Sequence, residues 1–183
     1  MCPGETTTTK SQEPMPKLTP EQVRDFLARP DVVCHISCLD HDGAPYLVPT
    51  NYLYEDGVFY LWARARSRWG QYLARDGRVG LCIDGGVQEG DEWAKRVLVR
   101  GRAGLIFGPG RVPDNPENPV RQLSYRTMRR VIPDLTFAEY VSSVAPEFDD
   151  VGFRLFRVEP SNVMSWWGEY AKRYRNAYPT PVW

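Results

Sequence analysis

The 183-residue sequence has no excess of either charge, because 23 lysines and arginines are balanced by 23 aspartates and glutamates. This balance argues against nucleic acid or an anionic membrane as the partner, although it leaves room for a local basic pocket. No apolar run approaches the roughly 20 residues that span a bilayer. We therefore expect a partner of the small-molecule kind, with no nucleic acid and no membrane involved.

Metal ligands are also scarce, with four cysteines and two histidines in the whole chain. No cysteine pair has the Cys-x-x-Cys spacing, so no metal site is expected. Cys34 and Cys38 fall four residues apart in an expected strand, roughly 13 Å from each other, which is too far for a disulfide. Reduced, buried thiols in a cytoplasmic protein are the expectation.

Several catalytic motifs are missing as well. The sequence has no nucleophile elbow, no phosphate-binding Walker loop and no dinucleotide fingerprint. Residues 1–17 contain four consecutive threonines and three prolines but no apolar signal core, so we expect a disordered leader and not a secretory peptide. Residues 18–183 are then expected to form one domain.

What is present is a series of short segments with alternating hydrophobicity, separated by turn residues. Asp42-Gly43 and Asp56-Gly57 are strong hairpin signals between extended runs. We expect strands over residues 32–39, 45–54, 58–63, 78–84, 93–107 and 151–158. This pattern predicts a mainly β protein with α insertions, built as a small six-stranded antiparallel barrel.

Helices are expected where capping residues precede apolar positions. Thr19 with Gln22 forms a capping box, Thr136 with Glu139 forms another, and Ser67 is placed to cap a third helix. A further helix follows the Gly- and Pro-rich loop over residues 108–119. Its expected apolar face comprises Val120, Leu123, Thr127 and Val131.

A cationic cluster stands where the third expected strand enters a helix. Arg64, Arg66 and Arg68 surround Ser67 at a helix start, where free backbone amides and the helix dipole favour an anion. The ligand predicted there is a phosphate, held mainly by Arg68 and Ser67. The alternative is that these arginines are solvated surface charges.

Other candidates are aromatic or polar residues in or near expected strands. Trp62 and Trp166 have faces suited to stacking on a flat ring, and packing in a core or a dimer seam is the alternative. Thr50 and Asn51 are short polar residues that either bond the edge of such a ring or face water. Arg96 is either a charge near the ligand or an exposed surface residue.

The order and spacing of several segments resemble those of the FMN-binding split barrels of the pyridoxamine 5'-phosphate oxidase-like superfamily. The resemblance covers roughly residues 18–167. The matching segments are 33–39, the turn Asp42-Gly43-Ala44-Pro45, the run from Leu47, Asp56 to Leu61, the Ser67-Arg68 helix start, 79–82, 97–103 and 156–160.

In that superfamily two chains form a homodimer, and the flavin lies in the groove between the barrels. The resemblance implies that Ser67 and Arg68 hold the FMN phosphate, although many relatives have lysine at the last of these positions. It also implies that Arg96 comes from a strand that approaches the ring or the phosphate. The residues expected to line the isoalloxazine are Pro49, Thr50, Asn51, Tyr52, Trp62 and Ala63.

The resemblance therefore predicts an FMN-dependent oxidoreductase that transfers hydride to or from a small organic substrate. The alternatives are a reductase that uses the deazaflavin coenzyme F-420, and a non-catalytic flavin- or haem-binding protein. Oxidation of vitamin B6 is not expected. The sequence lacks the glutamine and the basic C-terminal substrate motif of the true pyridoxamine-phosphate oxidases.

Overall fold

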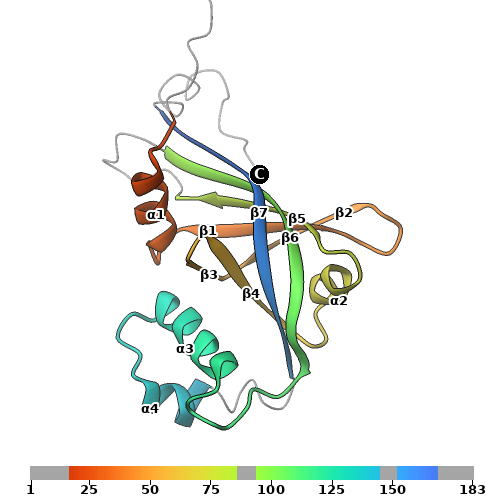
Figure 1. Cartoon of the computed structure of the whole chain (residues 1–183), viewed down its shortest axis with the longest axis vertical. Helices are drawn as coiled ribbons and strands as arrows, with labels where there is room; N and C mark the ends of the chain where they lie inside the picture. Colours follow the sequence, from red (N-terminus) through yellow and green to blue (C-terminus); the bar gives the residue numbers. More distant parts are fainter. Residues whose placement is uncertain (1–16, 86–93, 145–151, 169–183) are drawn as a thin grey trace, which may run out of the picture.

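A computed structural model describes residues 17–85, 94–144 and 152–168 (Figure 1). The expected leader up to residue 16, and the expected strand ends Trp93 and Val151, lie outside the described residues. In chain order the elements are α1 (Pro20–Ala28), β1 (Val33–Leu39), β2 (Pro45–Thr50), β3 (Tyr52–Glu55), β4 (Val58–Arg64), α2 (Arg68–Arg75), β5 (Arg78–Asp84), β6 (Ala94–Gly110), α3 (Pro119–Val131), α4 (Phe137–Glu139), the π-helix η1 (Tyr140–Val144) and β7 (Phe153–Gly168).

The strands form one antiparallel sheet in the order β2-β1-β5-β6-β7-β4-β3. Its edge strands, β2 and β3, are consecutive in the chain but are not hydrogen-bonded to each other. The sheet is therefore not closed, and its form is a split barrel. The expectation of a mainly β split barrel with helical insertions is confirmed.

The expected single strand over residues 45–54 was wrong, because the chain changes partners at Asn51. Thr50 still pairs with Cys34 of β1, whereas Tyr52 already pairs with Leu61 of β4 at the other edge of the sheet. No single ladder accommodates both pairings, so Asn51 lies outside both strands. The sheet consequently has seven strands where the sequence predicts six.

The two longest strands exceed their predicted lengths, and β7 continues through Pro160. Proline lacks the amide that a ladder needs. The β6–β7 register shifts between Arg100 and Gly101, and Gly101 lies opposite Pro160. A Cβ at Gly101 would stand 2.5 Å from the Glu159 carbonyl oxygen, so the strands approach closely there only because residue 101 is glycine. This irregularity lets the pairing continue past the proline.

Alternate residues of the strands form the core on the inner face of the sheet. In β1, Cys34, Ile36 and Cys38 face inward and are buried, and the two thiols are free and buried as predicted. Helix α1 covers one end of this core with Phe26 and Leu27, and the buried Tyr52 hydroxyl donates to the Leu27 carbonyl at 2.8 Å. The other buried members are Leu18, Val32, Phe59, Leu61, Ala63, Leu73, Val79, Leu81, Ile83, Val97, Val99, Ala103, Phe156 and Val158.

The predicted caps are confirmed, but the predicted face of α3 was wrong. Capping boxes start α1 and α4, and the Ser67 hydroxyl accepts from the Gly70 amide at the start of α2. On α3 the buried residues are Arg121, Ser124 and Thr127. Helix α3 lies outside the barrel core (Figure 1), and its Tyr125 and Met128 pack with Leu135, Phe137 and Tyr140 in a small separate apolar cluster. Among the described residues, no helix is long and apolar enough to cross a membrane.

The buried Cys34 thiol is expected to make the fold less stable at alkaline pH. Burial raises its pKa from 9.0 to about 12, and the nearby Arg130 charge opposes part of the shift. Above pH 9 the unfolded thiol loses its proton while the folded thiol keeps it, so deprotonation favours unfolding. The contribution of this group is fully present below pH 9 and decreases by up to about 1.4 kcal/mol per pH unit above it.

Urea unfolding at about pH 8 and about pH 10 measures this effect when the natural chain is compared with Cys34→Ala. The alanine variant has a cavity and is less stable at both values, but it should lose less stability between them. The remaining cysteines and Tyr52 are common to both proteins, so most of their titration cancels in the comparison. Equal losses in the two proteins would contradict the assignment to Cys34.

Candidate functional site

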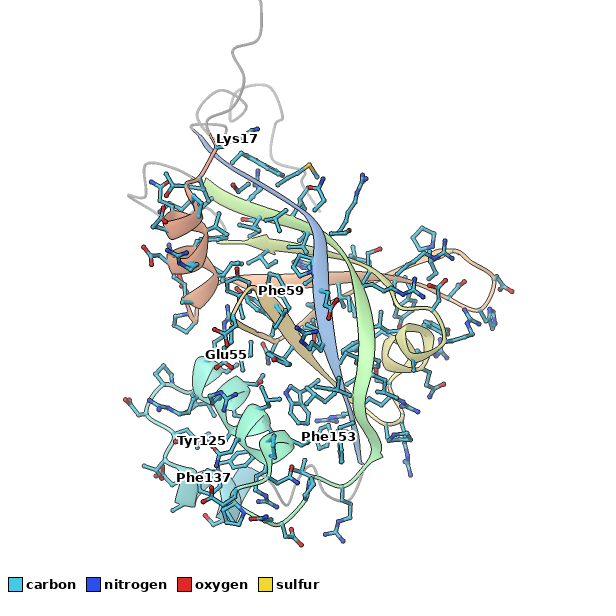
Figure 2. All side chains as sticks on the ribbon, in the orientation of Figure 1. Lys17, Glu55, Phe59, Tyr125, Phe137 and Phe153 are labelled. Atoms are coloured by element: carbon cyan, nitrogen blue, oxygen red, sulfur yellow. The ribbon has the colours of Figure 1, made fainter. Side chains whose placement is uncertain are left out.

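A cavity of about 160 Å³ lies where the end of β2, the end of β4 and helix α3 meet. It brings together Thr50, Asn51 and Trp62, which the sequence predicts as site residues. It also contains Arg64 of the cationic cluster. The remaining lining residues are Ser124, Thr127 and Met128 of α3 and Phe153 of β7. Figure 2 shows Phe153 close to the lower end of β7, beside α3.

Trp62 forms the wall between the sheet and α3. Its indole N–H donates to the Thr127 hydroxyl at 3.1 Å, and that hydroxyl donates to the Leu123 carbonyl at 2.9 Å. The Phe153 ring meets the indole edge to face, with 5.7 Å between centroids. These contacts fix the orientation of the indole, as required for an aromatic surface that positions a ligand.

The break in the ladder at Asn51 separates two hollows. Thr50 and Asn51 line the cavity on one side, and they also line a shallower hollow of about 300 Å³ with Pro49 and residues 30–33. Pro49 and Asn51 are exposed, and Thr50 is half-buried. Thr50 and Asn51 therefore offer polar groups to both hollows, and Pro49 contributes to the second one alone.

The cationic cluster lies directly after β4. Arg64, Arg66 and Arg68 are exposed, and no ion pair joins any of them to a carboxylate within the described part of the chain. Arg68 is the first residue of α2, and the Ser67 hydroxyl accepts from the Gly70 amide at 3.2 Å, which leaves its own proton to donate. A helix start with cations and a free hydroxyl proton has the chemistry of an anion site.

The position of this helix start is fixed by close packing and by backbone bonds. A Cβ on Gly70 would stand 2.5 Å from the Ala63 Cβ, so α2 touches β4 with no side chain between them. The Ala65 amide donates to the Gly152 carbonyl at 2.9 Å, and Arg154 donates to the Ala65 carbonyl. The turn that carries the cluster is thereby tied to the start of β7.

Two predicted site residues have side chains that point away from the cavity. Tyr52 is fully buried in the core, and Ala63 is buried against Gly70. Both face the inside of the sheet, because alternate residues of β3 and β4 do so. Neither residue lines the cavity.

Arg96 and Trp166 line neither of the hollows. They pair with each other across β6 and β7 on the outer face of the sheet, and the Arg96 Nε donates to the Asp84 carboxylate at 2.7 Å. The charge of Arg96 is therefore compensated within the chain. Within one chain, the structure does not bring these two residues to the cavity.

Sequence reasoning missed the contribution of α3 and Phe153 to the site. Ser124 and Thr127 are three residues apart and share one helical face, so their spacing was visible. The expected apolar face includes Thr127 but not Ser124. The signal in the sequence is that Ser124 and Thr127 form a small polar face on a helix whose opposite, exposed face is rich in arginine.

One cluster of possible metal ligands occurs among the described residues, in the β1–β2 hairpin. Asp40, His41 and Asp42 place one ligand atom each within 4.8 Å of one another. The Asp40 carboxylate already accepts from the amides of Asp42 and Ala44, both at 2.9 Å. This arrangement is accounted for by the turn itself.

The sequence over residues 19–167 matches the profile of the pyridoxamine 5'-phosphate oxidase family. No protein of curated function matches the chain. Because the family match covers most of the chain, it reaches from the cap of α1 to the end of β7 and includes every predicted site residue.

Solved structures share the fold at low sequence identity. A conserved hypothetical protein, Rv2991 from Mycobacterium tuberculosis, is 19% identical with a TM-score of 0.65, and the match covers 96% of this chain and 97% of that one. An FAD-binding protein from Mesorhizobium loti is 18% identical with a TM-score of 0.53, over 84% of this chain and 98% of that one. A protein described as F420 reductase is 17% identical with a TM-score of 0.55, over 79% and 98%.

Proposed function

Because this chain belongs to the pyridoxamine 5'-phosphate oxidase family, we propose that it is an oxidoreductase that binds FMN and transfers hydride to or from a small organic substrate. The observation that carries the proposal is the cationic cluster at the start of α2, which forms no ion pair with a described carboxylate and lies beside a cavity walled by Trp62, Thr50 and Asn51. One end of this site suits a phosphate, and the other suits a flat polar ring.

The donor set at the start of α2 fits the phosphate of FMN. Arg68 supplies a guanidinium, Ser67 a hydroxyl proton, and the first turn of the helix its backbone amides. Arg64 reaches the same region from β4 and lines the cavity. None of these arginines has to give up an ion pair with a described carboxylate to bind an anion.

The cavity alone is too small for the whole cofactor. Its volume of about 160 Å³ is below the roughly 300–1,000 Å³ of sites for drug-sized ligands. The hollow of about 300 Å³ on the other side of Asn51 extends the available space. We infer that the ring lies along Pro49, Thr50 and Asn51, with one end toward Trp62.

A second copy of the chain is proposed to cover this open groove. By register, one stripe of the outer sheet face contains Val33, His35, Leu47 and Pro49, and continues across β5 and β6 to Met164 and Trp166. Leu47 is 64% exposed and Met164 is 42% exposed. Exposed apolar side chains gathered on one flat face are typical of an interface. In such a dimer, Arg96 and Trp166 of one copy line the ligand site of the other copy.

Light scattering tests the dimer, and we expect a mass of about twice 21.0 kDa. The double variant Leu47→Glu/Met164→Glu places charges in the proposed seam and should give the monomer mass. Val131→Glu is the matched control, because Val131 is similarly exposed but lies on α3. A natural chain of monomer mass, or equal effects of seam and control variants, would refute this interface.

When bound, a flavin supplies the group that accepts or donates the hydride. The residues of this chain then bind, orient and shield it. Ser67 and Arg68 anchor one end, Thr50 and Asn51 offer hydrogen bonds to the ring edge, and Trp62 limits its movement. Thr127 acts through Trp62, because its hydroxyl accepts the indole proton. The absence of a nucleophile–base pair from the site agrees with chemistry carried by a cofactor.

The deazaflavin coenzyme F-420 is the second candidate, favoured by the shared fold with the F420 reductase. It carries a phosphate and a similar ring, so Ser67 and Arg68 suit either cofactor. The absorption and fluorescence spectra of the purified protein together distinguish them, since flavin and deazaflavin differ in absorption and emission maxima and a haem gives a Soret band. Titration of the colourless protein with FMN and F-420 then gives both affinities, and failure to bind either one would refute the proposed function.

A further inference from the structure

The cavity of about 160 Å³ lined by Trp62 and Thr127 is called the flavin cavity below. A second cleft, of about 330 Å³, lies on the opposite side of α3 from the flavin cavity. We call it the α3 cleft. It runs between the end of α1, strand β3 and the last turns of α3. Its lining residues are Leu27, Ala28, Leu53, Tyr54, Glu55, Arg126, Arg129, Arg130 and Pro133, none of which lines the flavin cavity. Figure 2 shows Glu55 above α3, between that helix and the sheet.

The α3 cleft has an excess of positive charge. Arg126 forms a bidentate ion pair with Glu55, at 2.8 and 3.0 Å, so these two charges cancel. Within the described residues, neither Arg129 nor Arg130 has an ion pair with a carboxylate. The three arginines and one glutamate of the cleft therefore leave two uncompensated positive charges.

Arg130 is held in place and has donor capacity left over. Its guanidinium lies 3.8 Å from the centroid of the Tyr52 ring, and one nitrogen donates to the Arg29 carbonyl at 2.6 Å. This bond caps the C-terminal end of α1 and satisfies one nitrogen of the guanidinium. It does not neutralise the positive charge of the side chain. The Arg130 Nε is buried and lacks a hydrogen-bond partner among the described residues. An unpartnered buried donor on a guanidinium indicates a missing acceptor.

Arg129 completes the cationic wall from the exposed side. It makes a long contact of 3.5 Å with the Pro133 carbonyl and lies 6.0 Å from the Tyr125 ring. Neither contact neutralises its charge, and the side chain is exposed. Arg129 is consequently free to turn toward a ligand that Arg130 already attracts.

The floor of the cleft is apolar. Its exposed carbon surface comes from Ala28 and Pro133, and Leu27 and Leu53 are buried beneath it. An inorganic anion would leave this surface exposed to water, whereas an anion attached to an apolar body would cover it. The volume also lies at the lower end of the range for small-molecule sites.

We propose that the α3 cleft binds a small organic anion, with a phosphate or carboxylate between Arg129 and Arg130 and an apolar body on Ala28 and Pro133. Guanidinium groups bind both anions through two parallel N–H donors. The site is separate from the cofactor cavity and does not depend on which cofactor the chain uses. Its ligand bonds to the last turns of α3, the helix that forms one wall of the flavin cavity.

The probes are phenyl phosphate, benzoate and inorganic phosphate, titrated at constant ionic strength into the full chain labelled for amide NMR. We expect phenyl phosphate to bind more tightly than inorganic phosphate and to shift the amides of Leu27, Ala28, Leu53 and Tyr54. Comparison with benzoate shows whether phosphate or carboxylate is preferred. Shifts confined to other residues, or no saturable binding of any probe, would overturn the proposal.

Arg129→Gln is the decisive variant because Arg129 is exposed and has no ion pair with a carboxylate among the described residues. It should weaken phenyl phosphate binding about tenfold, the loss expected for one charge-assisted pair. Arg102→Gln removes an exposed arginine of β6 outside the cleft and should leave the affinity unchanged. If both variants weaken binding equally, the effect is general surface charge and the α3 cleft is not the site.

A crossed pair of variants separates this site from the proposed flavin site. Arg129→Gln should leave FMN affinity unchanged, and Arg68→Ala should leave the phenyl phosphate shifts unchanged. If Arg68→Ala abolishes the phenyl phosphate shifts, the probe binds in the flavin cavity and the α3 cleft proposal is refuted. If FMN fails to bind but the shifts remain, the proposed function fails while the cleft stands.

Discussion

Replacing Arg68 with alanine is expected to weaken FMN binding by about ten- to hundredfold. Arg68 stands at the first position of α2, next to the Ser67 cap, and no described carboxylate competes for it. A charge-assisted hydrogen bond to phosphate contributes roughly 1.5–3 kcal/mol, which gives the expected range. Quenching of FMN fluorescence during titration measures the dissociation constant.

Two further variants locate the effect. Arg75→Ala removes an arginine from the other end of the same helix and should leave FMN affinity unchanged. Arg68→Lys keeps the charge but loses the paired donors of the guanidinium, so an intermediate affinity is expected. An unchanged dissociation constant for Arg68→Ala would place the phosphate elsewhere, and Arg64→Ala would then be the next variant to measure because Arg64 lines the cavity.

Replacing Gly70 with valine is expected to destabilise the fold by about 3 kcal/mol and to disturb the anion site together with it. A Cβ at this position alone would lie 2.5 Å from the Ala63 Cβ, which is below any normal contact distance. Neither atom can rotate away, since each is fixed to its backbone, so α2 must move off β4. The gain in helix propensity over glycine is under about 1 kcal/mol and does not offset the clash.

Urea unfolding with an unchanged slope measures the loss of stability, and the FMN titration measures the displacement of Ser67 and Arg68. Gly104→Val is the matched control, because the nearest atom to a Cβ there is 4.0 Å away. Adding Ala63→Gly to Gly70→Val should recover part of both losses, since it removes the atom that clashes. Equal stability of Gly70→Val and Gly104→Val would show that the close packing of α2 on β4 does not constrain the site.

Local features of the site could be predicted because each depends on residues close together in the sequence. The Ser67 cap, the cationic cluster behind it and the two Asp-Gly hairpin turns each use a few consecutive residues. Their backbone conformations follow, as the positive φ angles of Gly43 and Gly57 illustrate. The inward face of β1 also follows, because alternation along a strand is itself local.

The role of α3 could not be predicted in this way. Its sequence shows a plausible apolar face, yet the buried residues are Arg121, Ser124 and Thr127. Which face a helix buries depends on what it meets, and here it meets the Trp62 indole and the Asp114 carboxylate. The spacing of apolar residues identifies the most hydrophobic face of a helix, but a polar partner in the fold can cause a different face to be buried.

By itself, the sequence determined most of the strands, the helix caps, the hairpin turns and the position of the cations, because these follow from local propensity and spacing. Only the tertiary structure decided that Asn51 breaks one strand into two edges of the sheet. It also decided that α3 closes the cavity and that Arg129 and Arg130 form a separate cleft. These features depend on which segments meet across more than 60 residues of chain, as the bond between Trp62 and Thr127 does. Such long-range contacts leave no fixed spacing in the sequence.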